Sequence, residues 1–132
     1  MLETFMDSGV LITAWRGNTI AAVRALIMLS DSQRAFISSP FVQLELLPKP
    51  QFFKLQTEVA FYERYFAGVQ WWVSDCAQIV AEGLKLGRQF GLSALDSLHV
   101  AAALLSGADE FITAERPTSP FNRVAGLKVI FI

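Results

Sequence analysis

Strand-like and helix-like segments alternate along the whole chain, and this alternation restricts the possible folds more than any other feature. Between the strands, apolar residues recur every three or four positions, as in Asn18–Leu29, which is typical of a helix with one buried face. Strands that alternate with helices predict a mainly parallel sheet covered on both faces. We therefore expect an α/β fold, a three-layer α/β/α sandwich. The strand-like segments are Leu2–Met6, Ala35–Ser38, Val69–Val73, Phe111–Thr113 and Leu127–Ile132.

The expected helices begin and end at residues that favour helix termini. Ser39-Pro40 places a capping hydroxyl before a proline at the first helical position. Asp75 is followed three residues later by Gln78, the spacing of a capping box. We predict two further helices over Lys54–Phe66, which stops at Gly68, and over Ser93–Leu105, which stops at Gly107.

Length and composition exclude several classes of protein. The 132 residues fit one domain over residues 1–132, and a hydrophobic content of 53% excludes a disordered tail. No uninterrupted apolar run approaches the roughly 18 residues of a membrane span. The 11 basic and 12 acidic residues leave a net charge of −1, so nucleic acid would have to bind through a local patch. With one cysteine and no signal-peptide pattern, we expect a cytoplasmic protein.

Four acidic residues follow the predicted strands closely. Asp7 comes directly after the first strand, and Glu115 comes two residues after the fourth. Glu45 lies about two helical turns into the helix that follows the second strand, and Asp96 lies in the first turn of an alanine-rich helix. In parallel sheets the binding site lies outside the carboxyl ends of the strands. We therefore expect these four side chains to lie close together at that edge.

Clustered carboxylates need a cation to remain ionised together. A hard divalent ion with oxygen ligands fits this set of side chains, which favours Mg²⁺ or Mn²⁺. A zinc site of the histidine and cysteine type is disfavoured, because the chain has one histidine, His99, and one cysteine, Cys76. The sequence therefore predicts a magnesium or manganese site.

Three of these segments resemble the acidic motifs of the PIN-domain family. Met6-Asp7-Ser8-Gly9 resembles the opening motif, Leu95-Asp96-Ser97-Leu98-His99 the third acidic motif, and Phe111-Ile112-Thr113-Ala114-Glu115 the fourth. The resemblance extends over nearly the whole chain, and its most specific part is the segment around Asp96. The chain departs from the family pattern at Gly9, where asparagine is common, and at Glu115, where aspartate is usual.

The resemblance implies a PIN-like fold and a metal-dependent endoribonuclease similar to VapC toxins of toxin–antitoxin pairs. It implies RNA as substrate, and an antitoxin as protein partner. We expect Asp7 and Asp96 to bind Mg²⁺ or Mn²⁺ directly. Glu45 and Glu115 would complete the catalytic metal shell, partly through water, and position the attacking hydroxide. The ion would lower the pKa of that water and neutralise charge on the scissile phosphate. Ser8 and Thr113 are candidates for supporting hydrogen bonds.

Two other functions are compatible with the same pattern. A catalytically weak or inactive PIN-like interaction module is favoured by Gly9 and Glu115 and disfavoured by the intact Asp7, Glu45 and Asp96. A receiver-like phosphoacceptor domain also places acids at strand ends with Mg²⁺. That class is disfavoured because Lys128 lies inside the final strand rather than after it.

The acids at the helix starts also have ordinary structural interpretations. Asp7 stands at a strand-to-helix turn, where aspartate commonly caps a helix. Asp96 follows Ser93 by three residues, which is the S-x-x-D spacing of a capping box. In that role the Asp96 carboxylate would turn toward the backbone and away from a metal.

The remaining polar candidates have structural interpretations too. Glu45 is also compatible with a solvated helical side chain, and Glu115 with a surface ion pair to Arg116 or Arg123. His99 lies one helical turn beyond Asp96 and could orient a carboxylate or protonate a leaving oxygen. A lone helical histidine is more often a packed and hydrogen-bonded residue, which is the favoured interpretation. Candidate phosphate-binding arginines are Arg16, Arg116 and Arg123.

Aromatic residues predict a contact surface in the middle of the chain. The segment 52–66 carries Phe52, Phe53 and an apolar stripe at helical spacing, which is more apolar surface than one core contact needs. We expect a homodimer through this region, and the resemblance agrees, since dimers of the family use this part of the chain. Trp71 and Trp72 are expected in a buried parallel strand, and Cys76 as a small core residue. The stripe comprises Leu55, Val59, Tyr62 and Phe66, widened by Phe61 and Tyr65.

Overall fold

A computed structural model describes all residues 1–132 and shows one five-stranded sheet in the order β3-β2-β1-β4-β5. Every strand pair is parallel, and Phe5 of the central strand lies opposite Ile37 on one side and Phe111 on the other. The predicted parallel sheet is therefore confirmed. The strands are β1 (Leu2–Met6), β2 (Arg34–Ser38), β3 (Trp71–Trp72), β4 (Glu110–Thr113) and β5 (Val129–Phe131).

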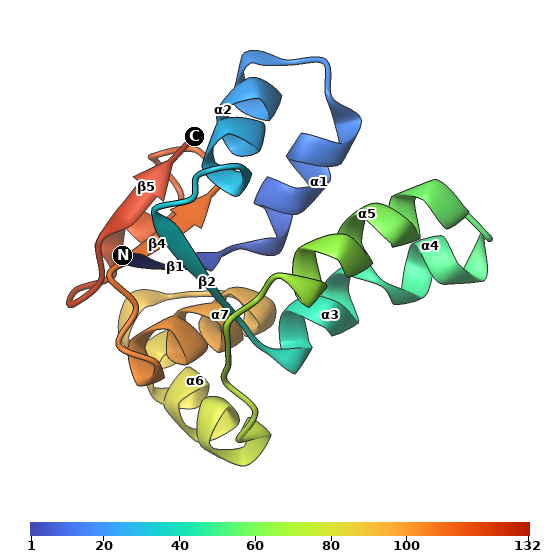
Figure 1. The fold of residues 1–132 in the computed structure, drawn as a ribbon. Helices are drawn as coiled ribbons and strands as arrows, with labels where there is room; N and C mark the ends of the chain where they lie inside the picture. Colours follow the sequence, from blue (N-terminus) through green and yellow to red (C-terminus); the bar gives the residue numbers. More distant parts are fainter.

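Helices cover both faces of this sheet, as the alternation predicts (Figure 1). The pair α1 (Ser8–Arg16) and α2 (Ile20–Leu29) lies on one face, and the pair α6 (Cys76–Phe90) and α7 (Ala94–Leu105) lies on the other. A short 3₁₀ helix, η1 (Pro120–Arg123), precedes β5. The three-layer α/β/α sandwich is thus confirmed. No helix is both long and apolar enough to cross a membrane.

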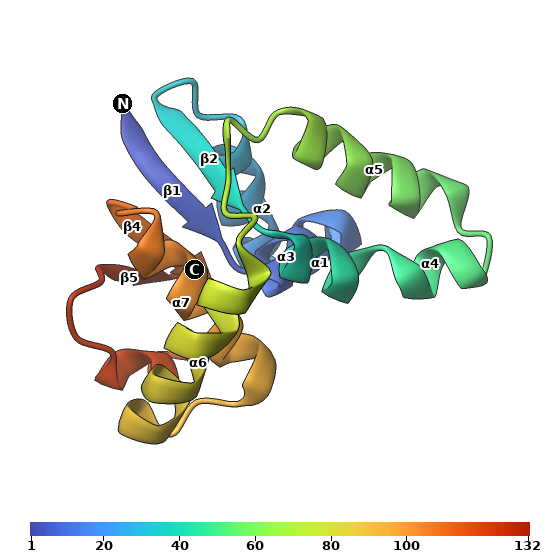
Figure 2. The ribbon, with the colours of Figure 1, turned by 90° about the horizontal axis from the view of Figure 1, so that it is seen from below.

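Three consecutive helices form an arm that projects from one side of the sandwich (Figures 1 and 2). They are α3 (Pro40–Leu46), α4 (Pro48–Phe52) and α5 (Gln56–Ala67). The sequence predicts two helices here, and the third arises because Pro48 lacks the backbone N–H that a continuous helix needs. Ser39 caps α3 as expected, since its hydroxyl accepts a hydrogen bond from the Phe41 N–H at 3.2 Å.

The core lies on both faces of the central strands. Phe5 and Phe111 stack across neighbouring strands with ring centroids 5.7 Å apart, and neither is exposed. On α7, the small residues Ala101, Ala102 and Ala103 are fully buried, so the helix lies close to the sheet. This packing fixes where the start of α7 meets the carboxyl ends of β1 and β4.

The predictions for Trp71, Trp72 and Cys76 are wrong. Trp71 is 58% exposed and Trp72 is 38% exposed. Both belong to β3, a two-residue strand at the edge of the sheet, so one side of the strand has no neighbour to cover it. Cys76 is the first residue of α6 and is exposed rather than packed in the core.

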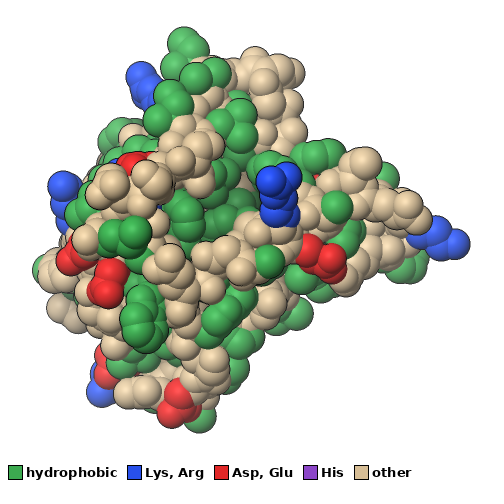
Figure 3. Space-filling model, in the orientation of Figure 1, with side chains coloured by type: hydrophobic (Ala, Val, Ile, Leu, Met, Phe, Trp, Pro, Cys, Tyr) green, Lys and Arg blue, Asp and Glu red, His purple; other side chains and the backbone are tan.

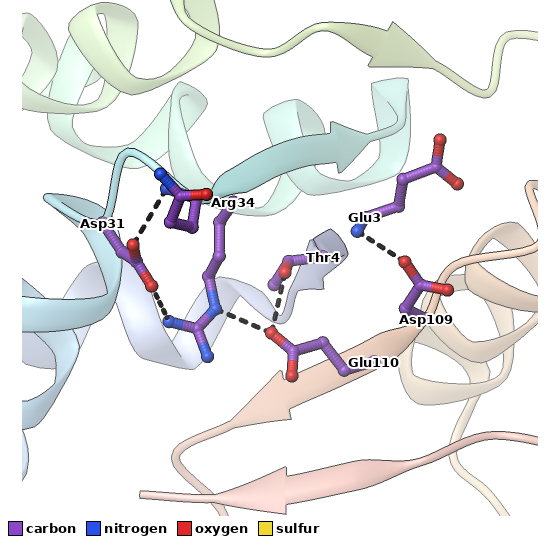
Figure 4. Close-up of polar contacts among 7 residues, drawn as sticks. Glu3, Thr4, Asp31, Arg34, Asp109 and Glu110 are labelled. Atoms are coloured by element: carbon purple, nitrogen blue, oxygen red, sulfur yellow. Dashed lines mark hydrogen bonds and ion pairs between the residues drawn. The ribbon is translucent and has the colours of Figure 1, made fainter. Parts of the chain in front are cut away.

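A buried ion-pair network joins the amino ends of the central strands (Figure 4). Glu110 is 2% exposed and accepts hydrogen bonds from Arg34 Nε at 2.7 Å and from the Thr4 hydroxyl at 2.8 Å. The same guanidinium lies 2.6 Å from Asp31. The expected strand Phe111–Thr113 begins one residue earlier in the structure, so Glu110 is the first residue of β4. The Glu110 carboxylate therefore stabilises the end of the sheet that lies opposite the candidate site.

Candidate metal centre

The first part of the site forms where β1 and β4 end side by side. The Asp7 N–H donates to the carbonyl of Ile112 at 2.9 Å, which holds the residue against the end of β4. The Thr113 hydroxyl donates to Asp7 Oδ2 at 2.9 Å, and both side chains are buried. Asp7 occupies the N-cap position of α1, yet its side chain makes no capping hydrogen bond. Its carboxylate therefore faces the sheet edge instead of serving as a cap.

The second acid reaches this point from the arm. Glu45 lies near the end of α3, and its Oε1 atom accepts a hydrogen bond from the Ser8 hydroxyl. The same oxygen lies 3.1 Å from Nε2 of His99, which comes from α7. Three elements that are distant in the sequence thus meet at Glu45. The supporting roles predicted for Ser8 and Thr113 fit these contacts.

Asp7, Glu45 and His99 form a compact set of potential ligands. One ligand atom from each lies within 4.8 Å of the other two. Two carboxylates at this separation, one of them buried, match the oxygen donors that Mg²⁺ and Mn²⁺ prefer. The residues therefore fit a divalent cation of this class.

Burial raises the pKa of the Asp7 carboxyl from an ordinary 3.8 to about 6. The nearby His99 imidazole and the hydrogen bond from Thr113 oppose this increase, while the charges of Asp96 and Glu45 add to it. A carboxylate so surrounded gains from a bound cation, which removes both the burial cost and the repulsion.

Asp96 lies beside this set in the first turn of α7. Its N–H contacts the Ser93 hydroxyl at 3.4 Å, so the predicted cap by Ser93 is present. Burial raises the pKa of the half-buried Asp96. Its hydrogen bond with Ser93 and the nearby His99 imidazole oppose this increase, while the Glu45 charge adds to it. The Asp96 carboxylate is therefore close enough to act electrostatically on the site, although it lies outside the most compact set.

Glu115 contributes its backbone rather than its side chain. Its N–H donates to the Thr113 hydroxyl at 3.1 Å, but the side chain is exposed and makes no hydrogen bond or ion pair. The surface pairing with Arg116 or Arg123 is absent. Arg123 instead donates to the carbonyl of Phe90 at 2.9 Å, near the end of α6. Of the four predicted acids, the structure brings Asp7 and Glu45 together, with Asp96 beside them.

His99 lies at the site, although the sequence favours a packed structural residue over a role there. It is packed and hydrogen-bonded as expected, with 1% of its surface exposed, but its partner is the candidate ligand Glu45. A signal was present in the sequence, because His99 follows Asp96 by three residues and so lies one helical turn away. The contact with Glu45 depends on how α7 packs against α3.

A hollow of about 380 Å³ opens beside Glu45, between α1 and the three helices of the arm. Arg16 and Lys49 line it, together with the aromatic side chains of Trp15 and Tyr62. On the face drawn in Figure 3 the basic side chains are scattered, without a large basic patch. Glu45 and Glu58 line the same hollow, so its two basic side chains lie beside two acidic ones.

Comparison with solved structures shows the fold of this chain. A chain of a toxin–antitoxin complex from Klebsiella pneumoniae superposes with a TM-score of 0.70 at 18% identity, covering 96% of this chain and 95% of that one. VapBC2 from Rickettsia felis, bound to a DNA fragment from its promoter, superposes with a TM-score of 0.75 at 14% identity, covering 99% of both chains. DNA-bound VapBC from Salmonella typhimurium superposes with a TM-score of 0.69 at 14% identity, covering 99% of this chain and 98% of that one. The expected PIN-like, VapC-like fold is confirmed.

No sequence-family model and no curated protein matches the chain. At these identities the structural likeness concerns the fold alone. Any assignment of activity therefore has to come from the residues at the sheet edge.

Proposed function

We propose that residues 1–132 form one PIN-like domain that hydrolyses RNA phosphodiester bonds as a metal-dependent endoribonuclease. One observation carries this proposal. Asp7 and Glu45 converge at the carboxyl ends of the parallel strands, and each is supported by a hydroxyl donor, Thr113 or Ser8. Two carboxylates held in this way would suit a divalent cation, which such a nuclease needs.

The roles of the acids follow from their positions. Asp7 and Asp96 would bind Mg²⁺ or Mn²⁺ directly, and Glu45 would complete the shell from the arm. The exposed Glu115 would act from the rim through water. When bound, the cation supplies a water of lowered pKa and neutralises charge on the phosphate. Ser8 and Thr113 hold the Glu45 and Asp7 carboxylates in place, and no nucleophilic side chain is needed.

The surroundings of Glu45 support RNA as the substrate class. Arg16 and Lys49 line the hollow beside Glu45 and provide positive charge for a phosphate backbone. Trp15 in the same hollow is 37% exposed and provides aromatic surface on which a base can stack. An RNA strand that follows this hollow would bring a phosphate close to the acids. We place this activity in the cytoplasm.

We also propose a protein partner of the antitoxin type. An apolar hollow of about 430 Å³ lies between α2 and α5, with Leu26, Phe36 and Tyr65 in its lining. Figure 3 shows hydrophobic side chains gathered on this part of the surface. On α2, Ile20 is 74% exposed and Ile27 is 64% exposed, which is unusual for isoleucine in a free protein. The similar chains from Klebsiella, Rickettsia and Salmonella are parts of toxin–antitoxin or VapBC complexes.

The alternative is a PIN-like module with weak or no catalysis. The observation that favours it is the exposed Glu115 side chain, which makes no contact with the other acids. Gly9 adds to it, because it presents no side chain where the family commonly has asparagine. In this case the protein partner, and not RNA hydrolysis, would be the function.

Cleavage of a mixed RNA pool decides between these two functions. With Mn²⁺ the parent should cut RNA, and EDTA should abolish the cutting. Asp7→Asn and Asp96→Asn should both reduce cleavage to background. Asp75→Asn is the matched control, since Asp75 caps α6 away from the site and asparagine also caps helices. A parent without Mn²⁺-dependent cleavage, or an Asp7→Asn variant that cuts like the parent, would refute the nuclease.

A further inference from the structure

The His99 imidazole is buried and contacts Glu45, one of the proposed metal ligands. It is 1% exposed, its Nε2 atom lies 3.1 Å from Glu45 Oε1, and its ring centroid lies 6.2 Å from that of Phe5. It is also the only histidine in the chain. Its position admits two roles: a nitrogen ligand for the metal, or a donor that orients Glu45.

The hydrogen-bond partners of the two ring nitrogens separate these roles. Nδ1 is buried and has no partner, so a proton on Nδ1 would be a buried donor without an acceptor. Nε2 faces a carboxylate oxygen, which can only accept. Both facts favour the tautomer that carries its proton on Nε2. In that tautomer the lone pair that a metal would use is on Nδ1, the atom turned away from Glu45.

We propose that His99 is a positioning residue that acts through Glu45, and that it is not a metal ligand. This inference rests on the proposed metal-dependent function. The Oε1 atom of Glu45 accepts from Ser8 on α1 and from His99 on α7, so two elements of the sandwich hold one oxygen of an arm residue. The second oxygen, Oε2, is left for the cation. His99 therefore sets the direction in which Glu45 offers its free oxygen.

This arrangement reverses the usual order of a histidine metal site. Commonly the histidine binds the metal and a carboxylate orients the histidine. Here the carboxylate is the ligand and the imidazole orients it. Glu45 stands on α3, the first helix of the arm, which Val42 and Leu46 anchor in the core. The hydrogen bond from His99 on α7 fixes the Glu45 side chain relative to the helix that also carries Asp96.

Nitrogen NMR on the whole protein tests the tautomer directly. Because the chain has one histidine, the two imidazole nitrogen signals need no assignment by mutagenesis. Without metal, and at a pH where the imidazole is neutral, the proton should be on Nε2, with Nδ1 bare. On addition of Mg²⁺, a diamagnetic ion, the proton should stay on Nε2. A proton on Nδ1, or loss of the Nε2 proton when Mg²⁺ binds, would overturn the proposal and make His99 a ligand.

Variants test whether His99 works through Glu45. His99→Leu removes the donor and should weaken Mn²⁺ binding, measured by calorimetry, roughly 10–100-fold, the usual loss when a group that orients a ligand is removed. His99→Gln places an amide N–H near the position of Nε2 and should restore most of that affinity. In a Glu45→Gln background, His99→Leu should cause no further loss. An equal loss in both backgrounds, or a His99→Gln variant as weak as His99→Leu, would overturn the proposal.

The two hypotheses fail in different ways. A folded parent that binds no Mn²⁺ and cuts no RNA would refute the proposed nuclease. A metal-binding, RNA-cleaving parent whose imidazole carries its proton on Nδ1 would refute only the role of His99. The NMR measurement uses the unmodified chain, so it decides the second question even where a His99 variant does not fold.

Discussion

Replacing Asp7 by asparagine should stabilise the metal-free protein. In the folded chain the Asp7 carboxyl is buried beside Glu45 and Asp96, so ionising it costs free energy that the unfolded chain does not bear. Asparagine has the same shape and no charge to ionise. It also keeps a side-chain oxygen that accepts the hydrogen bond from Thr113. The substitution therefore removes the repulsion and leaves the local geometry in place.

The expected gain follows from the pKa of Asp7. Its increase from 3.8 to about 6 corresponds, at 1.36 kcal/mol per unit, to about 3 kcal/mol of lost folding free energy once the group is ionised. The lost attraction between the Asp7 charge and the N-terminus of α1 offsets about 0.3–1 kcal/mol of this. A net gain of about 2 kcal/mol remains. For a chain of this length that is roughly 8 °C in melting temperature.

The gain must depend on pH in a specific direction. Because the folded pKa lies above the unfolded one, the parent loses stability as pH rises from about 4 to about 6, and the loss is complete above that range. In EDTA, Asp7→Asn should therefore melt well above the parent at pH 7.5 and close to it at pH 4.5. Asp75→Asn, an exposed N-cap change, should show no such pH dependence.

Metal should reverse the order of stability. An ion that binds only the folded state stabilises it by about 2.7 kcal/mol at a hundred times its Kd. Saturating Mg²⁺ should raise the melting temperature of the parent and scarcely change that of Asp7→Asn. A variant that melts at or below the parent in EDTA at pH 7.5, with no effect of metal on either protein, would refute the reasoning that these acids crowd around a cation position.

Three further predictions concern the rim, the arm and the far end of the sheet. Glu115→Gln should reduce RNA cleavage far less than Asp96→Asn, because the Glu115 side chain is exposed and would act through water; equal losses would make Glu115 a direct ligand. Sedimentation at micromolar concentration should give twice the monomer mass, through the region 52–66, where Phe52 is 77% exposed; a chain that stays monomeric on concentration would refute this dimer. Glu110→Gln should lower the free energy of unfolding by about 2 kcal/mol in denaturant titrations, since it weakens a buried charge-assisted bond to Arg34. Metal-dependent cleavage by that variant should be unchanged, and a matching loss of cleavage would contradict the separation of the two ends of the sheet.

The layers of the fold were predictable because they follow from local pattern. Apolar runs of strand length and capping residues such as Ser39 and Asp75 are read within a few residues, and each lies where expected. The arm was less predictable, because Pro48 splits it into an extra short helix. Trp71 and Trp72 were misplaced because exposure depends on strand order, and nothing local to β3 indicates that it lies at the edge.

The candidate site was predictable in part for the same reason. Parallel strands share one carboxyl edge, which is why Asp7 and the end of β4 at Thr113 meet. The direction of each side chain is a matter of tertiary packing. The contact between Glu45 and His99 requires α3 and α7 to meet, and the outward direction of Glu115 depends on the turn after β4. The spacing of residues along the chain predicts neither the contact between Glu45 and His99 nor the direction of the Glu115 side chain.

The most direct test of the central claim is anomalous diffraction from crystals of the parent soaked in Mn²⁺. One strong peak is expected at the carboxyl edge of the sheet, bound directly by the Asp7 and Asp96 carboxylates, with Oε2 of Glu45 completing the shell. His99 should remain hydrogen-bonded to Oε1 of Glu45 without touching the ion. The absence of a peak at saturating Mn²⁺, or a peak that avoids Asp7 and Glu45, would contradict the assignment of these residues as a metal centre.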